Sequence, residues 1–223
     1  DGTPRNATDL LTDPANTLSV TVNAPNNSAV YGSFAGRSIP YVVVICHPTT
    51  PANPRSGYAL PTGRSVPHMQ RGSDAPLWPD ATTRYPVLIF SHGYRSSPLS
   101  NDHLYAMTVF ASFGYVVAAP FHADATFSDL KLEDFGDLFY LLTHLENFLA
   151  MQALRPLALS ATIDLMLTRP QWRDRVDAVQ IGGFGASMGG ESLLLMAGAG
   201  LTTSIGQSWT AIAKDPRLKA AAT

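Results

Sequence analysis

The stretch that decides the fold reads AVQIGGFGASMGGESLLLMAG and runs from Ala178 to Gly198. Apolar residues lead into a cluster of glycines, and a second apolar run follows them. Five of the ten residues from Ile181 to Gly190 are glycine, and Ser187 lies among them. This order predicts a buried strand, a tight turn and a helix, with one hydroxyl presented at the turn.

Residues 185–189 fit the pattern G-x-S-x-G. A serine at a sharp strand-to-helix turn has a strained backbone, and a Cβ atom two residues before or after it would strike the neighbouring strand or helix. Gly185 and Gly189 remove those atoms, and Gly190 lets the helix pack closely on the sheet. Free N–H groups at the start of the helix favour a developing negative charge, which predicts Ser187 as a catalytic nucleophile.

Other glycine-rich motifs fit this stretch less well. A phosphate-binding loop needs lysine where Glu191 stands, and a carboxylate would repel a triphosphate. A dinucleotide fingerprint needs glycine or alanine where Met188 stands. A tight turn without catalytic function remains the alternative for these residues.

A second glycine turn follows an earlier apolar run, in LIFSHGYRSS at residues 88–97. Acyl transfer needs two N–H donors directed at the oxyanion, one after the nucleophile and one from a loop after an earlier strand. We expect Met188 and Tyr94 to provide them, and Gly93 to allow the close turn. We interpret His92 as a residue that holds this loop by hydrogen bonds, and not as the general base.

Strand-sized apolar segments alternate with helical ones along the rest of the chain, which favours an α/β fold with a mostly parallel central sheet and helices on both faces. Residues 1–223 are expected to form a single domain, with a surface excursion at 49–84. The expected strands are 17–25, 39–48, 84–93, 115–124 and 178–185; the expected helices are 100–114, 138–167 and 191–199; a turn into a further strand is expected at 215–223.

The helical region 125–175 has two interpretations. Its apolar stripes are explained by core packing, or by a cap over an apolar substrate. Pro156 is expected to break or kink the helix there.

Composition excludes several classes of function. Hydrophobic residues make up 45% of the chain and charged residues 14%, with a net charge of −2, so neither nucleic acid nor an anionic membrane is an expected partner. No apolar run is long enough for a transmembrane segment. Cys46 is the only cysteine, which rules out a disulfide within the chain. The six histidines lack metal-ligand spacing, so we expect no metal and no cofactor.

The chain begins at Asp1 without an initiator methionine, and its first thirty residues are rich in Asn, Thr, Pro and Ser. A mature exported protein looks like this after its signal peptide is removed, although a chain cut at this point would look the same. We therefore expect a secreted or periplasmic protein.

Two motifs, FSHG at 90–93 and GFGASMGG at 183–190, resemble the α/β-hydrolase superfamily. The resemblance covers about residues 85–223. Within the superfamily, the motifs resemble those of secreted lipases, cutinases and polyester hydrolases, and those of dienelactone hydrolases and platelet-activating factor acetylhydrolases. Arg155-Pro156, Asp164 and the DPRL of residues 215–218 are similar to the acetylhydrolase pattern.

The resemblance implies a catalytic acid and then a histidine after Ser187. One aspartate, Asp215, and no histidine follow Ser187 in this chain, and Asp215 fits a turn better than a triad. We therefore expect the N-terminal portion of the fold, with the last strands, the acid and the histidine on a C-terminal segment that accompanies it as a partner. If the chain is complete, His122 is the substitute base to test. A plainer interpretation is that His122 and Asp124 line the pocket or stabilise a loop.

The function expected from the resemblance is that of a serine esterase or lipase. Such an enzyme would cleave a short acyl ester, a lipid or a polyester through an acyl-enzyme on Ser187, with His92, Gly93 and His122 at the substrate pocket. A noncatalytic binding protein with a hydrolase fold is an alternative. An acyltransferase or peptidase on the same fold is another.

Overall fold

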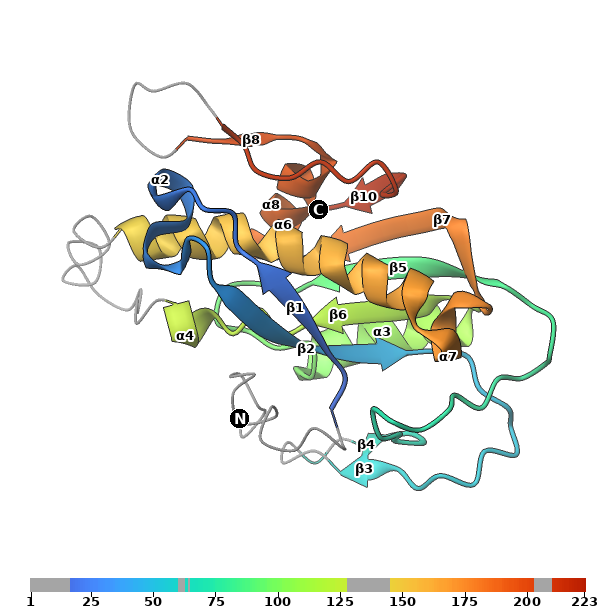
Figure 1. The fold of residues 1–223 in the computed structure, drawn as a ribbon. Coiled ribbons are helices and arrows are strands. Elements are labelled where there is room, and N and C mark those ends of the chain that lie inside the picture. Colours follow the sequence, from blue (N-terminus) through green and yellow to red (C-terminus); the bar gives the residue numbers. More distant parts are fainter. Residues whose placement is uncertain (1–16, 60–62, 64, 128–144, 203–209) are drawn as a thin grey trace.

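A six-stranded mixed sheet forms the centre of the computed structural model, which describes residues 17–59, 63, 65–127, 145–202 and 210–223 (Figure 1). The strand order is β1-β2-β6-β5-β7-β10. Strands β5, β6, β7 and β10 run parallel, and β2 pairs antiparallel with both β1 and β6. The strands are β1 (Ser19–Asn23), β2 (Ser38–Cys46), β5 (Tyr85–Ser91), β6 (Val116–Pro120), β7 (Val176–Gly185) and β10 (Ala220–Ala222).

Helices cover both faces of this sheet, as the sequence predicted (Figure 1). The long helix α6 and helix α8 pack on one face, and α3 packs on the other. The helices are α2 (Ser28–Tyr31), the 3-10 turn η1 (Gly32–Phe34), α3 (Asn101–Ser112), α4 (Asp124–Phe127), α6 (Leu145–Thr168), α7 (Pro170–Arg173) and α8 (Met188–Ala197). Two short strand pairs are β3 (Tyr58–Ala59) with β4 (Ser65–Val66), and β8 (Gly200–Leu201) with β9 (Thr210–Ala211).

The alternation of side chains along β6 separates two core layers. Val116 and Ala118 belong to the larger apolar cluster, which includes the buried side of α6. Val117 and Ala119 belong to a smaller cluster with Met107 of α3. Because successive side chains of a strand point to opposite faces, every residue of β6 is buried, which explains its nearly continuous apolar sequence.

A break or a kink was predicted at Pro156; helix α6 continues through this residue, so the break is wrong, and the kink stays a prediction. Proline removes the N–H group that would donate to the carbonyl of Gln152. Burial on both sides of Pro156 compensates for that loss, since Leu154 and Leu159 are 1% and 0% exposed. The described part of the region 125–175 thus packs on the sheet, while residues 128–144 lie outside the described residues. The cap over a substrate stays a prediction.

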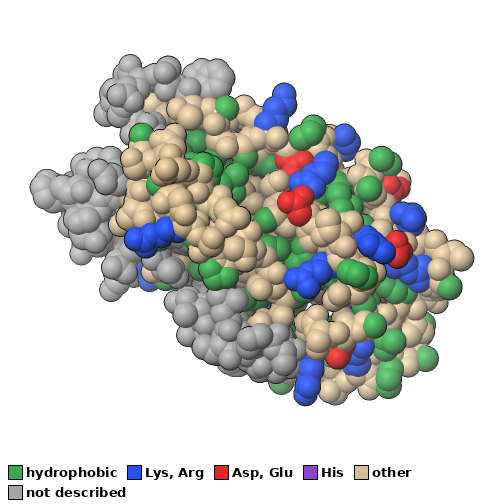
Figure 2. Space-filling view, viewed as in Figure 1, with side chains coloured by type: hydrophobic (Ala, Val, Ile, Leu, Met, Phe, Trp, Pro, Cys, Tyr) green, Lys and Arg blue, Asp and Glu red, His purple; other side chains and the backbone are tan. Residues whose placement is uncertain are grey.

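The long connection between β2 and β5 lies at the surface, where most side chains from residue 51 to 59 are exposed. Thr49 Oγ1 and the backbone of Thr50 both donate to the carbonyl of Leu77, which closes this excursion into a loop. On the face of the molecule drawn in Figure 2, basic and acidic side chains are dispersed and form no large patch of one sign. Within the described ranges, no helix combines the length and the apolar character that a membrane span requires.

Candidate active site

Ser187 lies at the turn between β7 and α8 and has an unusual backbone conformation. Its φ is 54° and its ψ is −123°, which a side-chain-bearing residue adopts only at a cost of about 1–3 kcal/mol. The residue is exposed, and its hydroxyl makes no capping hydrogen bond to α8. The turn therefore presents the hydroxyl to the surroundings at the start of a helix.

Close backbone contacts explain the glycines on both sides of Ser187. A Cβ atom on Gly185 would lie 2.5 Å from the carbonyl carbon of Gly189. A Cβ atom on Gly189 would lie 2.5 Å from the carbonyl carbon of Ser91 in β5. Glycine at these positions lets α8 start directly against the sheet, as the sequence predicted.

The loop after β5 meets the turn at Ser187. A Cβ atom on Gly93 would lie 3.6 Å from the Cβ atom of Ser187, and the Ala186 N–H donates to the carbonyl of Ser91 over 3.2 Å. Tyr94 follows Gly93 directly. Met188 is the first residue of α8, so its N–H has no acceptor within the helix. The oxyanion roles of Tyr94 and Met188 stay predictions that this placement makes possible.

His92 is 1% exposed and holds its loop from inside. Its Nδ1 lies 2.8 Å from the carbonyl oxygen of Gly93, and its Nε2 accepts the backbone N–H of His122 over 3.1 Å. These partners define a neutral ring protonated on Nδ1. Burial, and next the positive charge of Arg155, lower the pKa of His92 well below its usual range. His92 thus joins the loops after β5 and β6.

His122 is also 1% exposed, and its Nε2 lies 2.9 Å from the hydroxyl of Ser91. Its Nδ1 is buried without a hydrogen-bond partner among the described residues. Burial, and then the charge of Arg155, lower the pKa of His122 well below its usual range. His92 and His122 lie beneath the surface of the site, and their assignment to the substrate pocket, like that of Gly93, stays a prediction.

A buried ion pair beside this loop was not recognised as part of the site from the sequence. Arg155 of α6 binds the carboxylate of Asp124 through Nε and Nη2, over 3.1 and 2.6 Å, with side-chain exposures of 1% and 0%. Its Nη1 donates to the carbonyl of His92 over 2.7 Å. The signal in the sequence is one arginine inside the apolar run LENFLAMQALRPLAL, where burial requires a partner.

Of the four described residues with positive φ and a side chain, His68 lies in the excursion after β2, and the other three follow adjacent strands at the carboxyl edge of the sheet. They are Arg95 with φ 52°, Ala123 with φ 53° and Ser187 with φ 54°, after β5, β6 and β7 respectively. Strained backbone is concentrated at functional sites because the surrounding structure must hold it in place. Its location supports this edge as the candidate site.

No general base for Ser187 is identified among the described residues. None of the five described histidines has a recorded hydrogen bond to Ser187, and His144 lies outside the described residues. His122, the substitute base considered from the sequence, faces Ser91 instead.

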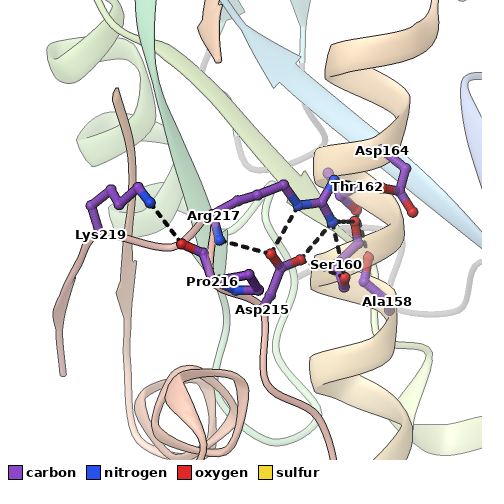
Figure 3. A network of polar contacts seen from close by, with 8 residues as sticks. All are labelled: Ala158, Ser160, Thr162, Asp164, Asp215, Pro216, Arg217 and Lys219. Atoms are coloured by element: carbon purple, nitrogen blue, oxygen red, sulfur yellow. Dashed lines mark hydrogen bonds and ion pairs between the residues drawn. The ribbon is translucent and has the colours of Figure 1, made fainter. Parts of the chain in front are cut away.

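Asp215 forms a turn, as the sequence indicated (Figure 3). Its carboxylate accepts hydrogen bonds from Ser160 Oγ over 2.6 Å and from Arg217 Nε and Nη2 over 2.8 and 2.5 Å. Burial acts to raise the pKa of Asp215, but the hydrogen bonds from Arg217 and Ser160 outweigh it and lower this pKa to about 2. Asp215 therefore attaches the turn before β10 to helix α6.

Two further observations bear on ligands. Among the described residues, no group of three His, Cys, Asp or Glu side chains is placed to hold a metal ion. A cavity of about 1000 Å³ lies between β2, α3 and the excursion after β2, away from Ser187. Its walls are mainly apolar and include Cys46, His47 and Trp172. We place the candidate active site at Ser187, because the strained turn, the start of α8 and the loop at Gly93 meet there and not at this cavity.

Comparison with known proteins supports the class of fold. The sequence matches no protein-family model and no curated protein. A ferulic acid esterase from Streptomyces cinnamoneus has a similar structure, with a TM-score of 0.52 and 23% identity over 80% of this chain and 53% of the esterase. The structure of a dienelactone hydrolase from Anabaena variabilis matches with a TM-score of 0.38 and 16% identity, over 82% and 56% of the two chains.

An α/β serine hydrolase without a lid from Xanthomonas campestris matches with a TM-score of 0.35 and 13% identity, over 82% of this chain and 56% of that one. The chain spans about half the length of these solved structures. The chain has an α/β-hydrolase fold, with a mostly parallel sheet, helices on both faces and a serine turn between β7 and α8.

Proposed function

We propose that this protein is a serine hydrolase that cleaves carboxylic esters through an acyl-enzyme on Ser187. The observation that carries the proposal is the exposed hydroxyl of Ser187 on a strained turn, opposite Gly93 and at the start of α8. The α/β-hydrolase fold supports it, and the esterase of similar structure is named for the cleavage of an ester.

In this mechanism Ser187 Oγ attacks the carbonyl carbon of the ester while its proton passes to a base. The carbonyl oxygen becomes an oxyanion that accepts hydrogen bonds from the N–H groups of Tyr94 and Met188. The alcohol leaves with a proton, and water then hydrolyses the acyl-enzyme to the free acid. The acid and the histidine that complete this chemistry are proposed to lie on a C-terminal segment outside residues 1–223.

A fluorophosphonate probe tests this proposal on the whole protein. We expect the probe to label the wild type at Ser187 and to leave Ser187→Ala unlabelled, with kcat/KM for an aryl acetate lower by about 10⁴-fold or more in that variant. Ser112→Ala, at the exposed end of α3, is the matched control and should retain both properties. An unlabelled but folded wild type, or labelling of Ser187→Ala at the wild-type rate, would contradict the proposal.

A substrate panel separates the possible reactions. Short acyl esters, long-chain lipid esters, a polyester film and a ferulic acid ester test the proposed ester substrates, and amide and alcohol acceptors test peptidase and acyltransferase activity. A noncatalytic binding protein would turn over none of them.

The intact mass of the labelled protein shows whether a C-terminal fragment accompanies it. Detection of the protein in the periplasm or the medium tests the proposed export.

A further inference from the structure

Arg155 connects helix α6 to the loop that the proposed function assigns to oxyanion binding. Besides its two bonds to the carboxylate of Asp124, the guanidinium donates to two backbone carbonyls of this loop. Nη1 lies 2.7 Å from the oxygen of His92, and Nη2 lies 3.3 Å from the oxygen of Gly93. Asp124 also accepts the backbone N–H of Arg95 over 2.7 Å. The ion pair therefore binds the loop on both sides of Tyr94.

These contacts contribute to the direction of one N–H group. The Gly93 carbonyl and the Tyr94 N–H belong to the same peptide unit, which is planar and trans, so the two groups point in opposite directions. Arg155, the ring of His92 and the backbone N–H of Ser96 hold the Gly93 oxygen toward the interior. The Tyr94 N–H is consequently directed away from Arg155, while Gly93 lies beside Ser187.

We propose that Arg155 is a positioning residue for the oxyanion hole. This role rests on the proposed function. Arg155, whose charge is balanced by Asp124, orients the Gly93–Tyr94 peptide so that the Tyr94 N–H faces the reacting carbonyl. Arg155 does not touch the substrate in this account. It acts through the backbone that it holds.

The chemistry of the guanidinium suits this role. Five N–H donors in a rigid planar arrangement can bind a carboxylate and two carbonyls at once, which the three donors of a lysine on a flexible chain do not reproduce. A buried arginine also requires a counterion, and Asp124 supplies it with 0% side-chain exposure.

The same helix also contacts the nucleophile's side of the site. Gln152, less than one helical turn before Arg155, donates through Nε2 to both carboxylate oxygens of Glu191, over 2.8 and 3.0 Å. Glu191 lies in the first turn of α8, and its N–H donates to the carbonyl of Ser187 over 3.3 Å. Helix α6 thus contacts both elements whose N–H groups are proposed to bind the oxyanion.

The test compares variants of the whole protein on an aryl ester and on the matching thionoester. Sulfur accepts hydrogen bonds weakly, so the preference for the oxygen ester reports on the oxyanion hole and not on overall stability. The main variant is Arg155→Met/Asp124→Asn, which removes both charges and leaves neither one buried alone. Arg155→Lys is the second variant. Arg217→Met is the matched control, because it removes another arginine that binds an aspartate beside α6, away from Ser187.

We expect Arg155→Met/Asp124→Asn to lower kcat for the oxygen ester by about 10- to 100-fold, with KM within about threefold of the wild type. The preference for oxygen over sulfur should fall by a similar factor, and Arg155→Lys should lie between that variant and the wild type. Arg217→Met should retain both values although its melting temperature falls, because Asp215 loses the arginine that balances its charge. If the double variant does not fold, Arg155→Lys decides by the same two readouts.

Two results would overturn the inference. If the wild type hydrolyses esters and is labelled at Ser187, but the Arg155 variants match Arg217→Met in kcat and in oxygen preference, Arg155 has no positioning role and the proposed function stands. If the wild type neither hydrolyses esters nor reacts with the probe, the proposed function fails and the inference fails with it.

Discussion

At Gly189 the backbone of α8 approaches β5 so closely that no side chain fits between them. Gly189→Ala should therefore lower the free energy of unfolding by about 3 kcal/mol or more, since neither backbone can move without displacing the other. Gly114→Ala is the matched control. Gly114 has φ +89° and open space around it, so Gly114→Ala should lower the free energy of unfolding only through backbone strain, by about 1–2 kcal/mol.

Urea unfolding of both variants measures these costs. Equal midpoints for the two alanine variants would show that the approach at Gly189 is less close than the structure indicates.

The roles of single residues differ in how well they can be predicted from the sequence. Ser187 and its glycines are recognisable because the requirement is local: a strained turn needs neighbours without side chains. Arg155 and Asp124 are each visible in the sequence, but their pairing joins positions 31 residues apart on different elements. No local pattern encodes that contact, and the only signal was a charged side chain within an apolar helix.

Helix α6 and the turn before β10 are joined by the ion-pair network of Asp215 (Figure 3). The pKa of Asp215 is about 2 in the folded protein and near 3.8 when unperturbed. A lowered folded-state pKa gives stability that is present above pH 3.8 and is lost as the pH falls toward 2. Asp215→Asn should therefore be less stable than the wild type by about 2 kcal/mol at pH 7, with the difference closing between pH 4 and pH 2.

Unfolding by urea across this pH range checks the prediction. Asp174→Asn is the control, because Asp174 has 69% side-chain exposure and a 3.6 Å ion pair that contributes little. A stability difference between Asp215→Asn and the wild type that is the same at pH 7 and pH 2.5 would contradict this role for Asp215.

The course of helix α6 at Pro156 differs from the prediction. The local geometry of Pro156 predicted a break or a kink in the helix, yet α6 is one unbroken helix from Leu145 to Thr168. The stability that holds it together comes from contacts with the sheet and with α8, which are tertiary and outweigh the loss of one hydrogen bond.

For the whole molecule, apolar periodicity predicted the sheet, its mostly parallel strands and the helices on both faces. The strand order was not predictable, since β6 lies between β2 and β5 although it follows both in the sequence. The meeting of loops after β5, β6 and β7 at one edge follows from this order. That edge brings Gly93, Asp124 and Ser187 together, and it is the basis of the proposed active site.

A crystal structure of the whole protein after reaction with a phosphonate ester tests the central claim most directly. The account predicts a covalent bond from Ser187 Oγ to phosphorus, with the phosphoryl oxygen about 3 Å from the backbone nitrogens of both Tyr94 and Met188. An adduct whose phosphoryl oxygen points away from these two nitrogens, or a modification on another residue with Ser187 unchanged, would contradict it.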